Sequence, residues 1–211
     1  MSVDEMKSMM PLSRRSVLTA TGGALLSASL PGTPWAMDKA GEVEALRGVA
    51  TALAGQGTRT LAPKEVVFIG DLVRTGAASR LHLRLGDRTF VRLGADTELR
   101  IDKYLQDAGG ELELVGGLMG FARSGPRAVQ DLQIRSAYGL IAVRGTRFYA
   151  GPAGGTFGVL VTEGRVAVSA GGRSVELAAN QGTDIASPGA PPSTPRRWPA
   201  DRARGLIASV S

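Results

Sequence analysis

Apolar and polar residues alternate with a period of two along most of the chain from Val66 onward. Such alternation places one set of side chains in a core and the other in solvent, which predicts strands rather than helices. Arginine or histidine separates several of the aliphatic positions between residues 80 and 101. The aliphatic positions expected to face the core are Leu81, Leu83, Leu85, Val91, Leu93, Leu99, Ile101, Leu112, Leu114, Leu132, Ile134, Val159, Val161, Val166, Val168, Val175 and Leu177.

Glycine and aspartate stand at the breaks between these segments, as in Gly86-Asp87 and in Gly94-Ala95-Asp96. Both residue types supply the positive φ angles that short hairpins need. Strands that recur at short, regular spacing favour a β fold over a βαβ fold. We therefore predict an all-β domain over residues 40–186, built as a sandwich or a solenoid-like stack of short antiparallel strands and hairpins.

The last segment, residues 187–211, has a different composition. Residues 187–195 are rich in proline, serine and glycine, which predicts a disordered linker. Beyond it, residues 199–210 have the pattern of a short helix whose apolar side holds Leu206 and Ile207, although Gly205 weakens that pattern. We expect a tail that is rich in proline and arginine and largely disordered.

Residues 1–36 have the pattern of an export signal. Arg14 and Arg15 lie in a run that resembles the twin-arginine motif, and a modest apolar stretch and small residues follow. The stretch is shorter than the roughly 18 apolar residues that a membrane span needs. We therefore expect export to the periplasm and no membrane span in the mature chain.

The formal net charge of +6 does not indicate a nucleic-acid-binding protein. The leader and the tail carry most of the excess, because Arg196, Arg197, Arg202 and Arg204 lie in the tail. The predicted β domain is nearly balanced, and phosphate binding needs a basic patch or stripe.

The sequence offers little material for catalysis. Cysteine is absent, and the one histidine, His82, lies between Arg80 and Arg84 at outward strand positions, where a solvated side chain is expected. Several aspartates fall at turns, where that residue is structurally favoured. We predict a protein that is not an enzyme and that holds no metal and no cofactor.

Ten residues form ordered segments that centre on glycine, and glycine within a strand pattern marks a bulge or a close backbone approach. In order and spacing these segments resemble the FecR domain family, over about residues 40–186. We expect Gly145 at a bulge or crossing where a side chain would collide, and Gly164 at the turn of a hairpin. The ten are Gly70, Asp71, Thr75, Gly76, Arg144, Gly145, Thr146, Phe148, Glu163 and Gly164.

The resemblance implies a periplasmic all-β module known from iron-citrate signalling regulators. Full-length members also have a cytoplasmic segment that holds a sigma factor, followed by one membrane span. We expect only the export signal before the domain, and Ser136-Ala137 and Asn180-Gln181 replace two short family motifs. We therefore expect a stand-alone exported domain that acts as a sensory or regulatory module and binds another envelope protein, such as a sensor or an outer-membrane component.

Four arginines share the outward parity on successive predicted strands: Arg80, Arg84, Arg92 and Arg100. If those strands pair in sequence order, the arginines form a stripe that can bind the carboxylates of a partner. The alternative is a solvated face that discourages edge aggregation. Two other functions remain open at this point, a glycan- or cell-wall-associated structural module and a carboxylate-dependent hydrolase.

Overall fold

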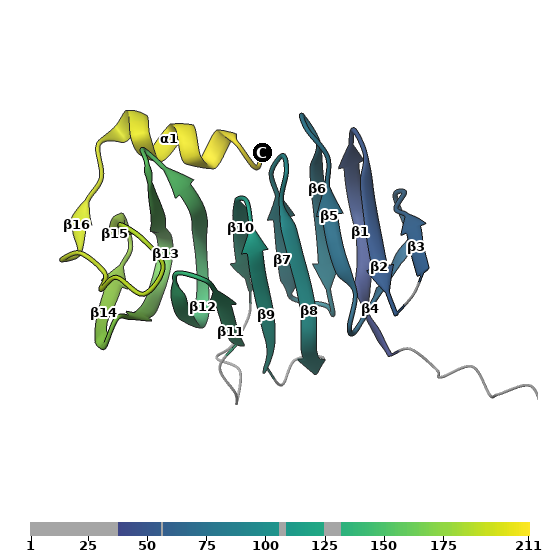
Figure 1. The fold of residues 1–211 in the computed structure, drawn as a ribbon, viewed down its shortest axis with the longest axis horizontal. Helices are drawn as coiled ribbons and strands as arrows, with labels where there is room; N and C mark the ends of the chain where they lie inside the picture. Colours follow the sequence, from purple (N-terminus) through teal and green to yellow (C-terminus); the bar gives the residue numbers. More distant parts are fainter. Residues whose placement is uncertain (1–37, 56, 106–108, 125–131) are drawn as a thin grey trace, which may run out of the picture. The chain divides into compact units, whose positions relative to one another are not determined.

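The computed structural model describes residues 38–55, 57–105, 109–124 and 132–211. These residues form one sixteen-stranded sheet and a single short helix, which confirms the prediction of an all-β fold. Figure 1 shows the sheet with the helix at the C-terminal end of the chain. The predicted export motif at Arg14 and Arg15 lies outside the described residues.

The sheet consists of two runs of strands that meet at two long strands, β12 (Gly139–Ala153) and β13 (Thr156–Ala170). The first run, in spatial order, is β3 (Gly57–Thr60), β2 (Ala50–Ala54), β5 (Leu72–Thr75), β8 (Glu98–Leu105), β9 (Gly109–Gly116) and β11 (Leu132–Ser136). The second run, which starts next to β12, is β10 (Met119–Arg123), β7 (Thr89–Leu93), β6 (Arg80–Leu85), β1 (Lys39–Arg47) and β4 (Val66–Phe68).

Strand β12 joins the two runs because its pairing partner changes along its length. Its first part, Gly139 to Val143, pairs with β11, and its later part, Arg147 to Ala150, pairs with β10. The neighbouring strand β13 changes partners in the same way, from β15 (Gln181–Ile185) to β14 (Arg173–Ala178). The sheet therefore divides at this point, and residues between the two pairing regions form its corner.

The pairing differs from the prediction of antiparallel hairpins in two respects. Strands β9 and β11 are parallel, whereas every other pair in the described part of the sheet is antiparallel. Strand β7 pairs with β6 and β10 and not with its neighbour in sequence, β8. Consecutive strands therefore do not always lie side by side.

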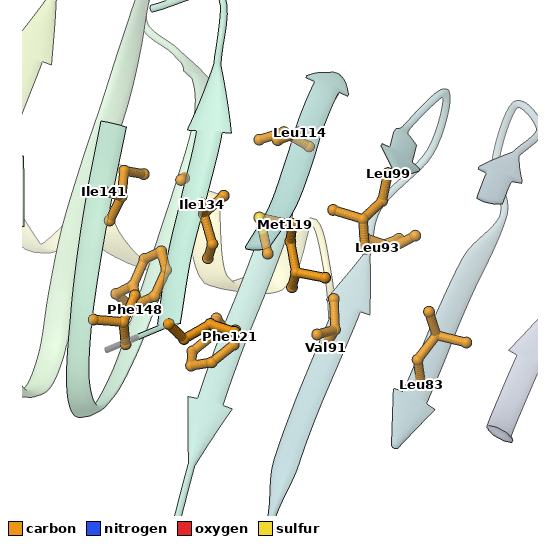
Figure 2. Packing of buried hydrophobic residues seen from close by; sticks show 14 of the residues in the cluster. Leu83, Val91, Leu93, Leu99, Leu114, Met119, Phe121, Ile134, Ile141 and Phe148 are labelled. Carbon is orange, nitrogen blue, oxygen red and sulfur yellow. The ribbon is translucent and has the colours of Figure 1, made fainter. Parts of the chain in front are cut away.

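Both runs contribute to one apolar core. Every aliphatic position that the alternation assigns to the core is buried, from Leu81 in β6 to Leu177 in β14. Figure 2 shows Val91 and Phe121 of the second run in the same cluster as Leu99 and Leu114 of the first run. The shared core explains how a single sheet forms a stable domain, because each run covers the apolar face of the other.

The prediction of a largely disordered tail is wrong. The short β16 (Arg196–Arg197) pairs with β15, and α1 (Ala200–Ala208) follows, as the helical pattern predicts. Three apolar tail residues, Trp198, Leu206 and Val210, form a second buried cluster with Tyr149 and Leu160 of the sheet. The local composition does not predict that the tail is ordered, because the apolar side chains that pack against it lie far away in the sequence.

Glycines in the sheet make room for this tail. A Cβ atom on Gly158 or Gly182 would lie within 2.4 or 2.5 Å of the Trp198 ring. At the other end of the tail, Val210 lies close to Gly94 and Gly120. The tail therefore packs as part of the same compact unit as the sheet.

A cluster of polar side chains holds the tail in place beside Trp198. The guanidinium of Arg202 stacks 3.7 Å from the Trp198 ring centre, donates to the Ala153 carbonyl at 2.9 Å, and pairs with Asp184. Burial acts to raise the pKa of Asp184, but hydrogen bonds from Arg202, Arg196 and Thr156 outweigh it and hold that pKa below its ordinary value. Asp184 is therefore a charged anchor for the tail at neutral pH.

Candidate functional site

The outer face of the second run carries the side chains that alternate with the core. On β6 and β7 the residues between buried positions include His82, Phe90 and Arg92, and all three are at least partly accessible to solvent. On β10 the corresponding outward residues are small, Gly120 and Ala122. Because β10 carries small side chains and its neighbouring strands carry larger ones, the surface of the sheet has a depression over β10.

The strand register defines the shape of this depression. Gly120 lies between Arg92 of β7 and Tyr149 of β12, and Ala122 lies between Phe90 and Arg147. The result is a hollow of about 200 Å³ with β10 as its floor, and we name it the β10 hollow. Its lining also includes Glu44, His82 and Ser124.

Two arginines and one glutamate are the charged residues that line the β10 hollow. Arg92 is exposed and makes no ion pair with any acidic group in the described part of the chain. Arg147 pairs with Glu163 at 2.8 Å. Glu44 lies 3.6 Å from the guanidinium of Arg84, which pairs more closely with Glu42. The hollow is therefore suited to a negatively charged group.

His82 behaves differently from the solvated side chain that its sequence context predicts. It is half-buried, and burial lowers its pKa below the ordinary value. The charge of Arg92 lowers that pKa further, whereas the Val210 backbone and the Glu44 carboxylate act in the opposite direction. His82 is therefore neutral at pH 7 and adds no charge to the hollow.

The four arginines do not form the stripe that pairing in sequence order would produce. Arg100 lies on β8 in the first run, where it pairs with Glu113 at 3.2 Å. Arg84 forms ion pairs with Glu42 and Glu44, and Arg80 donates to the Ala208 carbonyl at 3.4 Å. Arg92 alone among the four lines the β10 hollow.

Sequence alternation could place Phe90 and Arg92 outward but could not identify the other residues of the hollow. Arg147 and Tyr149 come from β12, more than fifty positions later in the chain, and only the position of β10 between the two strands brings them together. Tyr149 is only 6% exposed, because it packs under α1. The hollow therefore lacks the pair of open aromatic rings that a glycan platform would use.

The upstream motif residues stabilise turns. Asp71 is fully buried and accepts hydrogen bonds from the Phe68 backbone at 2.8 Å and from Arg59. Thr75 donates to the Gly94 carbonyl at 2.6 Å and accepts from the Thr97 backbone at 2.9 Å. Gly70 has a φ of +90°. The Gly76 carbonyl accepts hydrogen bonds from Ser79 and Asp96.

The downstream motif residues build the corner of the sheet, and here two expectations are wrong. Gly164 lies within β13 and not at a hairpin turn, and Gly145 faces open space, so a side chain there would not collide. Gly145 has a φ of +56°, and the register between Arg144 and Arg147 of β12 is irregular, which is typical of a bulge. A Cβ atom on Gly164 would instead lie 2.7 Å from the Gly145 carbonyl oxygen.

The remaining corner residues anchor this bend to the core and across the strands. Phe148 is fully buried and stacks on Phe121 at 5.3 Å, and Thr146 is buried beside Gly164. Glu163 pairs with Arg147 across the two strands. The structure therefore places these motif residues in the framework of the fold, at the edge of the β10 hollow.

Within the described residues there is no cluster of three or more histidine, aspartate or glutamate side chains that would hold a metal ion. Across the same residues, no helix has the length and apolar character of a membrane span.

Comparisons with known proteins agree with the predicted family. Residues 71–167 match the family described as FecR protein. No sequence among curated proteins matches the chain. Two crystal structures, at 1.65 and 2.50 Å resolution, are similar in fold; both are described as a "putative anti-sigma factor" from Parabacteroides distasonis.

The likeness to these structures concerns the fold. For each of them the TM-score is 0.55 and the sequence identity is 17%, over 64% of this chain. The match covers 64% and 63% of the two solved chains, so this chain spans less than two thirds of their length. The family match over residues 71–167 confirms, for that part of the chain, the FecR resemblance that the glycine-centred segments predict.

Proposed function

We propose that this protein is a non-catalytic regulator of envelope signalling, which acts in the periplasm by binding another envelope protein. The observation that carries this proposal is the FecR match over residues 71–167. The fold it shares with a chain described as a "putative anti-sigma factor" supports the same class of function. The outer face of the second run is the surface through which we expect the partner to bind.

The chemistry of the β10 hollow favours binding over catalysis. His82 is the residue best suited to proton transfer, but burial and Arg92 lower its pKa, and no hydroxyl or carboxylate is held against it by a hydrogen bond within the described residues. Catalytic bases are typically oriented by a second side chain and lie beside a nucleophile. Arginine and aromatic side chains at a surface hollow are typical of interface centres.

Export through the twin-arginine route is part of the proposal. Replacing both Arg14 and Arg15 with lysine is expected to leave the protein in the cytoplasm, because the route reads the arginine pair itself. Cell fractionation followed by immunoblotting measures this. Replacing Arg196 and Arg197 with lysine is the matched control and should leave export unchanged. Normal periplasmic accumulation of the Arg14/Arg15 double variant would contradict the claim.

Binding and regulation can be tested together in the bacterium. A tagged full-length chain, cross-linked in intact cells and purified, is expected to retain one envelope protein that the tag alone does not. Deleting the gene for the chain and deleting the gene for that protein should then alter the same set of transcripts, which RNA sequencing measures. If no envelope protein is retained, or if the two deletions share no transcripts, the proposed function is wrong.

A further inference from the structure

We propose that the β10 hollow recognises an acidic segment of the partner protein, with one aspartate or glutamate side chain between Arg92 and Arg147 and a neighbouring apolar side chain against Phe90. This inference rests on the proposed function, because it assumes that the ligand is a protein. It goes further in naming the site and the chemistry that the partner must present.

The size of the hollow sets the size of its ligand. The floor strand β10 separates β7 from β12, and two strand spacings amount to about 10 Å. The volume of the hollow, about 200 Å³, is smaller than the roughly 300–1,000 Å³ of pockets that hold drug-sized molecules. One or two side chains of a larger molecule fit this space.

The charged residues of the hollow indicate that its ligand is negatively charged. Arg92 has no acidic partner in the described part of the chain, so its guanidinium is free to bind an anion. Arg147, on the facing wall, is exposed and already orients one carboxylate, that of Glu163. Arginine binds carboxylates in a planar, bidentate geometry. A carboxylate of the partner that lies between Arg92 and Arg147 would therefore complement the hollow in both charge and shape.

The surface beside Arg92 explains why an apolar neighbour is expected. Phe90 and Ala122 form one end of the hollow, and both are partly exposed. The Val210 side chain, next to Gly120 at the other end, prevents extension of the hollow beneath α1. A segment with an acidic residue followed by phenylalanine or leucine therefore matches the hollow over its accessible length.

Labelled twelve-residue peptides provide a direct probe of this site. Each carries one Glu-Phe or Asp-Leu pair in a glycine and serine background, and a matched set carries Gln-Phe or Asn-Leu. Fluorescence anisotropy with the full chain is expected to show at least tenfold tighter binding of the acidic set. Raising the salt concentration should weaken it, because salt screens exposed charges.

Two substitutions test whether the peptides occupy the hollow. Arg92→Glu should reduce the affinity at least tenfold by reversing the charge. Ala122→Leu should reduce it similarly by filling the floor while the charge stays the same. Arg173→Glu, at an exposed position on β14, makes the same charge change elsewhere and should leave affinity unchanged. Thermal melting of each variant verifies that it is folded.

The outcomes separate this inference from the proposed function. Equal affinity for acidic and amide peptides, no binding of either set, or binding that survives both Arg92→Glu and Ala122→Leu would overturn the inference. If the chain still retains its envelope protein in cells after these substitutions, the proposed function stands and the partner binds elsewhere. Failure of the unaltered chain to retain any envelope protein would overturn the proposed function itself.

Discussion

Replacing Gly164 with valine is expected to lower the free energy of unfolding by about 3 kcal/mol, within the range for strained and overpacked sites. Two costs add at this position. Its φ of +79° is a conformation that β-branched residues rarely adopt. Its Cβ would also lie 2.7 Å from the Gly145 carbonyl oxygen and from the methyl group of Thr146. Chemical denaturation monitored by circular dichroism measures the loss.

Two other glycines are controls for these separate costs. Gly145→Ala imposes a positive φ without a collision and should cost about 1–2 kcal/mol. Gly116→Ala has neither problem, because its surroundings are open and its φ is ordinary, and it should stay within about 0.5 kcal/mol of the native chain. If Gly164→Val is no more harmful than Gly116→Ala, the corner does not depend on close contact between β12 and β13.

Replacing Trp198 with alanine is expected to weaken docking of the tail by about 3–5 kcal/mol, the usual cost of truncating a buried large aromatic residue. The ring is only 4% exposed, fits over Gly158 and Gly182, and supports Arg202. Since the main core does not include Trp198, we expect the tail to detach while the sheet remains folded. Hydrogen exchange of β16 and α1, with the core strands as reference, measures this.

Two further variants serve as comparisons for the Trp198→Ala experiment. Gly182→Val should produce the same loss of protection, because its side chain would occupy the position of the Trp198 ring. Arg204→Ala changes an exposed residue of α1 and should leave protection unchanged. Full protection of α1 in the Trp198→Ala variant would show that the tail is held by other contacts.

Several features of this protein follow from sequence alone because they depend on local chemistry. The alternation of aliphatic and polar residues identifies the buried face of each strand, since successive side chains in a strand point in opposite directions. The pattern over residues 199–210 predicts α1. The glycine-centred segments indicate the FecR domain, which the family match over residues 71–167 confirms.

The expectations that were wrong concern contacts between distant segments. The sequence does not show that β10, and not β8, lies beside β7, so it predicts an arginine stripe that includes Arg100 where the structure has a hollow around Arg92. It also misses the order of the tail, because Trp198 is stabilised by glycines that lie 16 to 40 positions earlier.

The corner of the sheet, where β12 changes partners, shows the same distinction between local chemistry and long-range contacts. A glycine in a strand pattern signals an unusual backbone, and both Gly145 and Gly164 have a positive φ. Which of the two is sterically enclosed depends on how β12 and β13 cross, and that contact places the Gly145 carbonyl against Gly164. The sequence by itself therefore determined which residues face the core and where the chain bends. The tertiary structure decided which strands are neighbours, because many similar apolar faces can pair and only the packing of the whole core selects among them.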